Sequence, residues 1–212
     1  MTASRPPRSD ARANRVGILD AARSALADDP RASIDAIARS AGLSRRTLYG
    51  HFDDREALIR ELVAVGAQRF NTLATSVTDA DPRLALARLA ALLWHEASHV
   101  QVAAAIALDE AHVTDTAAAL APVRRMVSEL VRRGQDEELF RTDLAAPTLA
   151  RLIEEVSRTV VSRTDASSPS AADLAVRTVL SIAGLSWREA DALLAAHPDV
   201  LETRPDSAKE TE

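Results

Sequence analysis

Residues 38–52 read ARSAGLSRRTLYGHF, which predicts two short helices joined by a glycine turn. Gly42 stands where the first helix must stop and the chain must turn sharply. Such a place often requires a positive φ, which glycine adopts at little steric cost. Ser44 follows as a capping residue, so the second helix begins there and carries Arg45 and Arg46 in its first turn. A helix-turn-helix presents side chains in this way to the major groove of DNA.

The flanking residues complete a unit of three helices. Ser33 is placed to cap the first of the two short helices, and Leu48 and Phe52, four positions apart, are expected to face inward. Asp53 and Glu56 match a capping box at the start of a longer helix. We therefore expect a compact DNA-binding unit that is followed by a connecting helix.

The same residues resemble the signature of the TetR/AcrR family of bacterial transcriptional regulators. The resemblance is carried by Ala41-Gly42-Leu43-Ser44, Thr47-Leu48-Tyr49, His51-Phe52 and Arg55-Glu56-x-Leu58. It implies an all-α fold with an N-terminal helix-turn-helix three-helix DNA-binding domain and a C-terminal helical effector-binding and dimerisation domain. It also implies a homodimer that binds a palindromic operator, usually as a repressor, and is released by a small-molecule effector. Two residues depart from the usual pattern: Arg55 replaces a lysine, and Arg46 stands where small residues are common.

Side chains of this unit are candidates for contact with double-stranded DNA. Arg45 and Arg46 can donate paired hydrogen bonds to guanine edges, and Thr47 can touch a thymine methyl group or a phosphate. The resemblance assigns Tyr49, His51 and Arg55 to phosphate contacts, which set register without reading sequence. The candidate DNA-binding residues are Ser33, Ser44, Arg45, Arg46, Thr47, Tyr49, His51 and Arg55.

The length of 212 residues suits one small DNA-binding module and one larger helical module. We predict a flexible basic arm over residues 1–9 and a helix-turn-helix domain over residues 10–55. A helical ligand-binding and dimerisation domain over residues 56–197 follows, and its connecting helix spans residues 54–72. Residues 198–212 are polar and charged with little to bury, so we expect a disordered tail.

The net charge of −5 is unevenly distributed. Residues 1–72 carry 12 arginines against 9 acidic residues, whereas residues 73–212 carry 14 basic and 22 acidic residues. A mildly basic head can neutralise phosphates while an acidic body stays away from DNA. The chain has no cysteine, which excludes disulfides and thiolate metal sites. No apolar run approaches the roughly 20 residues that cross a bilayer, so we expect a cytoplasmic protein with no membrane partner.

Two apolar helical patterns in the second half are candidates for a dimer interface. The resemblance implies that the last two long helices pair with their counterparts in a second subunit. The open alternative is that they are core helices of a monomer. The candidate interface residues are Leu149, Leu152, Ile153, Val156, Val160, Leu174, Val179 and Leu180.

The pattern His95-Glu96-Ala97-Ser98-His99 raises an alternative function, because two histidines four apart on a helix can bind zinc with the glutamate as a base. A zinc-dependent hydrolase or a metal sensor would use this segment. A hydrolase needs a third ligand, yet no third histidine follows at the short spacing of related enzymes. We therefore predict a protein that is not an enzyme, with no catalytic residue, no metal and no cofactor.

A small-molecule cavity is the other use that this segment allows. Helices with apolar faces can surround such a cavity, and Trp94, His95, His99 and Met126 are its candidate ligand-binding residues. A third class remains open, namely a dimeric helical adaptor whose helix-turn-helix does not read DNA.

Overall fold

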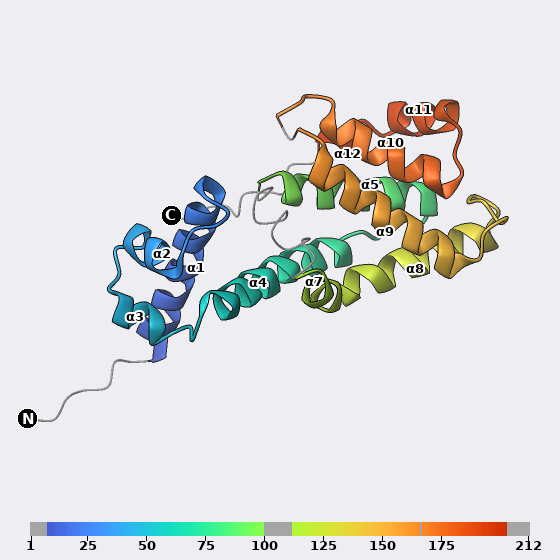
Figure 1. Cartoon of the computed structure of the whole chain (residues 1–212). Helices are drawn as coiled ribbons and strands as arrows, with labels where there is room; N and C mark the ends of the chain where they lie inside the picture. Colours follow the sequence, from blue (N-terminus) through green and yellow to red (C-terminus); the bar gives the residue numbers. More distant parts are fainter. Residues whose placement is uncertain (1–7, 100–111, 166, 203–212) are drawn as a thin grey trace, which may run out of the picture.

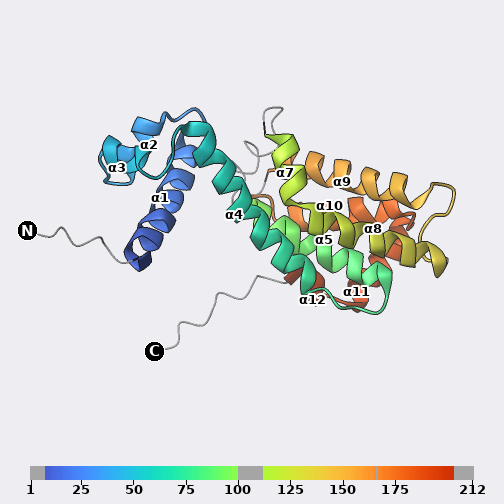
Figure 2. The ribbon, with the colours of Figure 1, turned by 90° about the horizontal axis from the view of Figure 1, so that it is seen from below.

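The computed structural model describes residues 8–99, 112–165 and 167–202, and the regular secondary structure in these ranges is all helical. The helices are α1 (Arg8–Asp28), α2 (Ile34–Ser40), α3 (Arg45–Tyr49), α4 (Arg55–Thr75), α5 (Pro82–His99), α7 (Val113–Ala119), α8 (Ala121–Asp136), α9 (Ala146–Arg163), α10 (Ala171–Ala183), α11 (Trp187–Ala196) and α12 (Asp199–Glu202). Helices α1–α3 form a small lobe, called the head here, and α5 with α8–α12 forms the larger body (Figure 1). Helix α4 runs from the head to the body, with α7 alongside it (Figure 2).

The turn between α2 and α3 has the predicted local structure. The hydroxyl of Ser33 accepts a hydrogen bond from the amide of Ala36 at 3.2 Å, which caps α2. Gly42 has a φ of +65°, so the chain turns where glycine is favoured over other residues. The hydroxyl of Ser44 accepts from the amide of Thr47 at 3.1 Å and caps α3. These three local predictions are confirmed.

The head has its own hydrophobic core, in which Leu48 and Phe52 are buried as expected. The predicted capping box of Asp53 and Glu56 is wrong. The N-cap of α4 is Asp54, whose carboxylate accepts from the amide of Ala57 at 2.6 Å. The turn after α3 thus ends one residue later than the pattern indicated.

The body is built around α5, which packs against α8, α9, α10 and α12. Its core is mostly aliphatic, and its fully buried large side chains include Leu86, Leu89, Val131, Leu149, Val176 and Leu180. Helix α5 starts at Pro82, and the preceding Asp81 accepts hydrogen bonds from the backbone and guanidinium of Arg83. The guanidinium bond to Arg83 lowers the pKa of the Asp81 carboxyl. None of the described helices is long and apolar enough to cross a membrane.

Two glycines allow the α8–α9 connection to lie close to its neighbours. A Cβ at Gly134 would stand 2.1 Å from Cδ2 of Phe140, so the buried ring fills the space where a side chain would begin. Gly184 ends α10 with a φ of +112° and leaves room for the backbone of Arg141. The amide of Arg141 donates to the carbonyl of Ala183 at 2.8 Å, which fastens this connection to the end of α10.

The predicted arm and the predicted tail at the two ends of the chain have different outcomes. Residues 1–7 of the predicted arm lie outside the described residues, and α1 begins at Arg8. The prediction of a disordered tail from residue 198 is wrong for α12, because Val200 is fully buried in the body core. Asp199 also accepts from Arg88 at 2.7 Å. Residues 203–212 lie outside the described residues.

Candidate DNA-binding surface and ligand cavity

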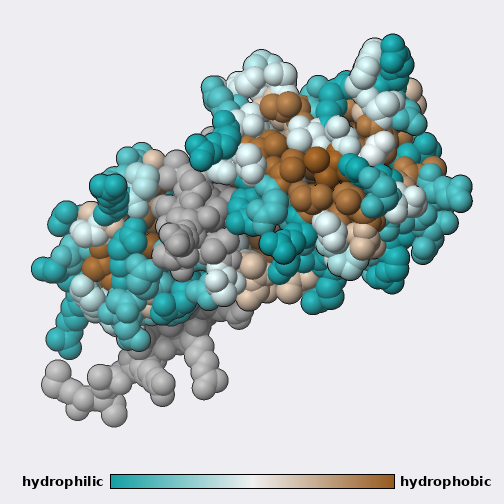
Figure 3. Space-filling view, turned by 45° about the vertical axis from the view of Figure 1, so that its right-hand side comes forward, coloured by the Kyte–Doolittle hydropathy of each residue, from teal (hydrophilic) through white to brown (hydrophobic). Residues whose placement is uncertain are grey.

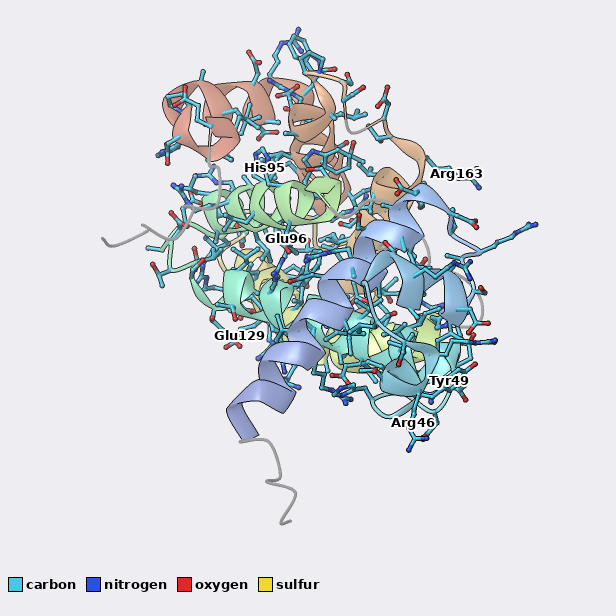
Figure 4. All side chains as sticks on the ribbon, turned by 90° about the vertical axis from the view of Figure 1, so that its left-hand side faces the viewer. Arg46, Tyr49, His95, Glu96, Glu129 and Arg163 are labelled. Atoms are coloured by element: carbon cyan, nitrogen blue, oxygen red, sulfur yellow. The ribbon has the colours of Figure 1, made fainter. Side chains whose placement is uncertain are left out.

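The recognition helix α3 presents its polar side chains on the surface of the head. Arg45, Arg46, Thr47 and Tyr49 are exposed, whereas Leu48 between them is fully buried. Figure 4 shows Arg46 and Tyr49 at the outer edge of the head, directed away from the body. The predicted candidates on α3 therefore lie together on an accessible surface.

The two arginines at the start of α3 differ in their contacts. Arg45 is ion-paired with Asp35 of α2, and both its Nε and its Nη2 donate to the carboxylate. Arg46 makes no ion pair or side-chain hydrogen bond with a described residue. The guanidinium of Arg46 therefore has no partner among the described residues, whereas that of Arg45 is engaged by Asp35.

Arg55, Thr47 and Ser44 also have partners within the head. Nε of Arg55 donates to the carbonyl of Ala32 at 3.1 Å, and its Nη2 donates to that of Pro30 at 2.9 Å. These bonds fasten the segment before α2 to the start of α4. The resemblance assigned Arg55 only to a phosphate contact, and these two carbonyl partners could not be predicted because they lie more than 20 residues away in the sequence. The hydroxyl of Thr47 lies 2.8 Å from that of Ser44.

Arg15 of α1 holds the end of the recognition helix in place. Its Nε donates to Glu61 of α4 at 2.6 Å, and its Nη1 donates to the carbonyl of His51 at 3.1 Å. Its guanidinium also lies 4.6 Å from the ring centroid of Phe52. The hydrogen bond to Glu61 raises the pKa of Arg15. Sequence reasoning missed this residue, since its partners are 36 to 46 positions away and no local pattern joins them.

A cavity of about 330 Å³ lies between α4 and the body and extends to α1 of the head. The residues that line it come from seven helices and are mostly apolar. They include Leu19 and Leu26 of α1, Leu62 and Phe70 of α4, Leu93 and Trp94 of α5, Ala117 of α7, Val127 of α8, Ile153 and Val161 of α9, and Val179 of α10. This size and lining are those of small-molecule sites.

The cavity contains one of the four predicted ligand-binding residues. Trp94 lines the cavity and is only 5% exposed. His95 and Met126 do not line the cavity. Met126 packs against the body core, and Glu96, the neighbour of His95 on α5, lines the cavity wall. The side chain of His99 lies outside the part of the chain that the structure describes. Trp94, His95 and His99 belong to α5 and Met126 belongs to α8. Figure 4 shows His95 and Glu96 on different sides of α5, and Glu96 is the one that lines the cavity.

A polar contact joins the head end of α4 to the cavity wall. Nε2 of His112, which precedes α7, lies 2.9 Å from Oε2 of Glu56. His112 is 5% exposed, and α7 supplies Thr116 and Ala117 to the cavity. The head and the cavity are therefore connected through α7 as well as through α4.

The candidate dimer residues separate into two groups. Leu149, Ile153, Val179 and Leu180 are buried in the core of a single chain, so their assignment to an interface between chains is wrong. Val156 and Val160 are partly exposed. Leu152 is 40% exposed and Leu174 is 49% exposed. The helical periodicity identified the faces of α9 and α10 that pack inward, and Leu152 and Leu174 belong to the outward side.

The alternative metal site depends on His99, whose side chain lies outside the described residues. No group of three metal-ligating side chains occurs within the described ranges. His95 and Glu96 are consecutive residues of α5, and Glu96 is paired with Arg69 of α4 at 3.7 Å.

The described helices and the surface of α3 define an all-helical helix-turn-helix protein with a cavity between α4 and the body. The family model of the bacterial regulatory proteins of the tetR family matches residues 18–62. Those residues are similar to the DNA-binding domain of tetR-family regulatory proteins, and the chain has the fold of solved TetR-family transcriptional regulators. No curated protein sequence matches the chain.

Several solved structures share this fold across most of the chain. The TetR-family regulator PfmR from Thermus thermophilus has a TM-score of 0.68 and 19% identity, covering 80% of this chain and 98% of its own. The fatty acid degradation regulator FadR from Bacillus halodurans has a TM-score of 0.68 and 18% identity, covering 88% and 100%. The ketosteroid regulator KstR2 of Mycobacterium tuberculosis has a TM-score of 0.66 and 21% identity, covering 80% and 93%.

Proposed function

We propose that this protein is a dimeric repressor that binds a palindromic operator and is released by a small-molecule effector. The observation that carries the proposal is an exposed recognition helix held to its neighbours by Arg15, with Arg46 free to contact DNA. A side chain on a rigidly held helix reaches the major groove in a defined register. The protein acts in the cytoplasm, where it blocks access to a promoter.

The outward sides of α9 and α10 support the dimer. Leu152 and Leu174 are large apolar side chains that a monomer leaves in water. Figure 3 shows an apolar area on the surface of the body. A two-fold axis through this surface buries such side chains and places two recognition helices on successive half-sites.

The cavity supports a role for an effector. Its wall includes α1 of the head and α4, so a bound molecule contacts the elements that position α3. A ligand releases DNA only to the extent that it binds the released conformation more tightly than the DNA-bound one. Another protein of this fold, FadR from Bacillus subtilis, has been solved in complex with stearoyl-CoA. We infer that the cavity of this chain is also an effector site.

Selection of bound duplexes from random DNA tests the proposal. We expect a palindrome whose half-sites are separated by about one helical turn. Arg46→Ala should weaken binding about tenfold or more, and the slope of log affinity against log salt should identify lost phosphate contacts. A purified protein that shows no preference among duplexes at moderate salt would instead indicate the adaptor, and stoichiometric zinc bound through His95 and His99 would revive the hydrolase.

A further inference from the structure

We propose that the cavity takes an uncharged, mainly aliphatic molecule with one acceptor oxygen, which accepts a hydrogen bond from the indole N–H of Trp94. This inference deepens the proposed effector site and rests on it. Two observations carry it: the arginines in the wall are paired with carboxylates, and the indole N–H of Trp94 has no acceptor among the described residues.

The arginines in the described wall of the cavity are all engaged by carboxylates. Nε of Arg124 lies 3.0 Å from Glu154, and Nη2 of Arg158 lies 2.6 Å from Glu155. Arg69 is paired with Glu96, and Arg23 is paired with Asp20. An anionic ligand must therefore exchange with, or share the arginine with, a carboxylate of the protein that already neutralises its charge. That exchange makes a carboxylate or phosphate head group a poor match for the wall.

The apolar part of the wall favours aliphatic over aromatic ligands. Among the described residues that line the cavity, only Phe70 and Trp94 are aromatic, and Phe70 belongs to α4 while Trp94 belongs to α5. The other apolar residues are alanine, valine, leucine and isoleucine. A chain or a saturated ring buries its surface against these side chains without requiring stacking partners.

Trp94 gives the cavity a donor for one polar atom of the ligand. The residue is 5% exposed, packs against Ala171 and Ala175, and lines the cavity. Its indole N–H makes no hydrogen bond to a described residue. The indole nitrogen nevertheless keeps some accessible surface, unlike the fully buried polar atoms that have no partner. We infer that this N–H opens to the cavity. Buried indole groups normally find an acceptor, and a ligand oxygen supplies one.

Isothermal titration calorimetry with 2-decanone and decanoate at pH 8 tests this inference on the full chain. The two probes have the same chain length, and decanoate is ionised at this pH. We expect 2-decanone to bind at least tenfold more tightly than decanoate. Trp94→Phe keeps an aromatic ring and should weaken 2-decanone about threefold to tenfold, the range of one hydrogen bond. Trp187→Phe is the matched control, because Trp187 is 68% exposed and outside the cavity.

A second variant reverses the preference. Glu154→Gln frees Arg124 from its ion pair, so it should raise the affinity for decanoate at least fivefold and leave 2-decanone unchanged. The inference is overturned if decanoate binds the unmodified protein more tightly than 2-decanone, if 2-decanone does not bind, or if Trp94→Phe has no effect. Binding of the selected duplex is measured separately. If 2-decanone binds without releasing DNA, the ligand class stands and the proposed effector role fails.

Discussion

The guanidinium of Arg45 lies against the carboxylate of Asp35 and donates to both of its oxygens. The pair joins the start of the recognition helix to α2 on the surface of the head, and the Arg45 side chain is 70% exposed. In this arrangement Nε and Nη2 of Arg45 donate to Asp35 and are not available for a paired hydrogen bond to a guanine edge.

Asp35→Asn should raise the affinity for duplex DNA about threefold to tenfold, because it frees Arg45 and removes a negative charge beside the recognition helix. The slope of log affinity against log salt should steepen by about one. Fluorescence anisotropy over a series of salt concentrations measures both effects. Asp115→Asn, an exposed change on α7, is the control. Weaker binding by Asp35→Asn would show that Asp35 positions Arg45 for base contact.

Leu174→Glu should convert a dimer to a monomer, because it places a charge on the outward side of α10 at a side chain that is 49% exposed in one chain. The affinity for the selected palindrome should also fall, because each monomer then binds its half-site independently. Sedimentation velocity measures the state of association. Trp187→Glu replaces another exposed apolar residue, on α11, and should leave the dimer intact. A dimeric Leu174→Glu protein would place the interface elsewhere.

Glu56→Ala should lower the free energy of unfolding by about 0.5–1.5 kcal/mol, the net value of one hydrogen bond. The contact of Glu56 with buried His112 is lost, so the amides of α7 should exchange faster with deuterium. Urea unfolding and hydrogen exchange report the two effects. Glu129→Ala on the exposed side of α8 (Figure 4) should change stability by less than about 0.5 kcal/mol. Unchanged exchange in α7 would show that the contact does not hold this helix.

Gly134→Ala should destabilise the body by about 1–3 kcal/mol, because the new Cβ meets the buried ring of Phe140 at 2.1 Å. Gly17→Ala is the opposite case: it lies inside α1 with nothing within 4 Å of the new Cβ. It should stabilise the protein by about 0.5–1 kcal/mol through helix propensity. Thermal unfolding followed by circular dichroism compares the two. A Gly134→Ala protein as stable as the parent would mean that Phe140 moves aside freely.

The head was largely predictable because its decisive contacts are local. The caps at Ser33 and Ser44 link residues three positions apart, and Gly42 meets a backbone requirement of its own position. The spacing of Leu48 and Phe52 is enough to identify the face that packs inward. Even there, two adjacent aspartates can both cap, and the backbone selected Asp54 over Asp53.

The sequence by itself determined the two short helices α2 and α3, the turn at Gly42 between them and the polar residues that α3 carries. The tertiary structure decided which of them are available: it paired Arg45 with Asp35, assigned Arg55 to the loop before α2, and turned Leu149 and Leu180 inward. It also placed Trp94 in the cavity. The physical reason is that periodicity marks an apolar or polar face of a helix, whereas the identity of the partner depends on segments tens of residues away, which only folding brings together.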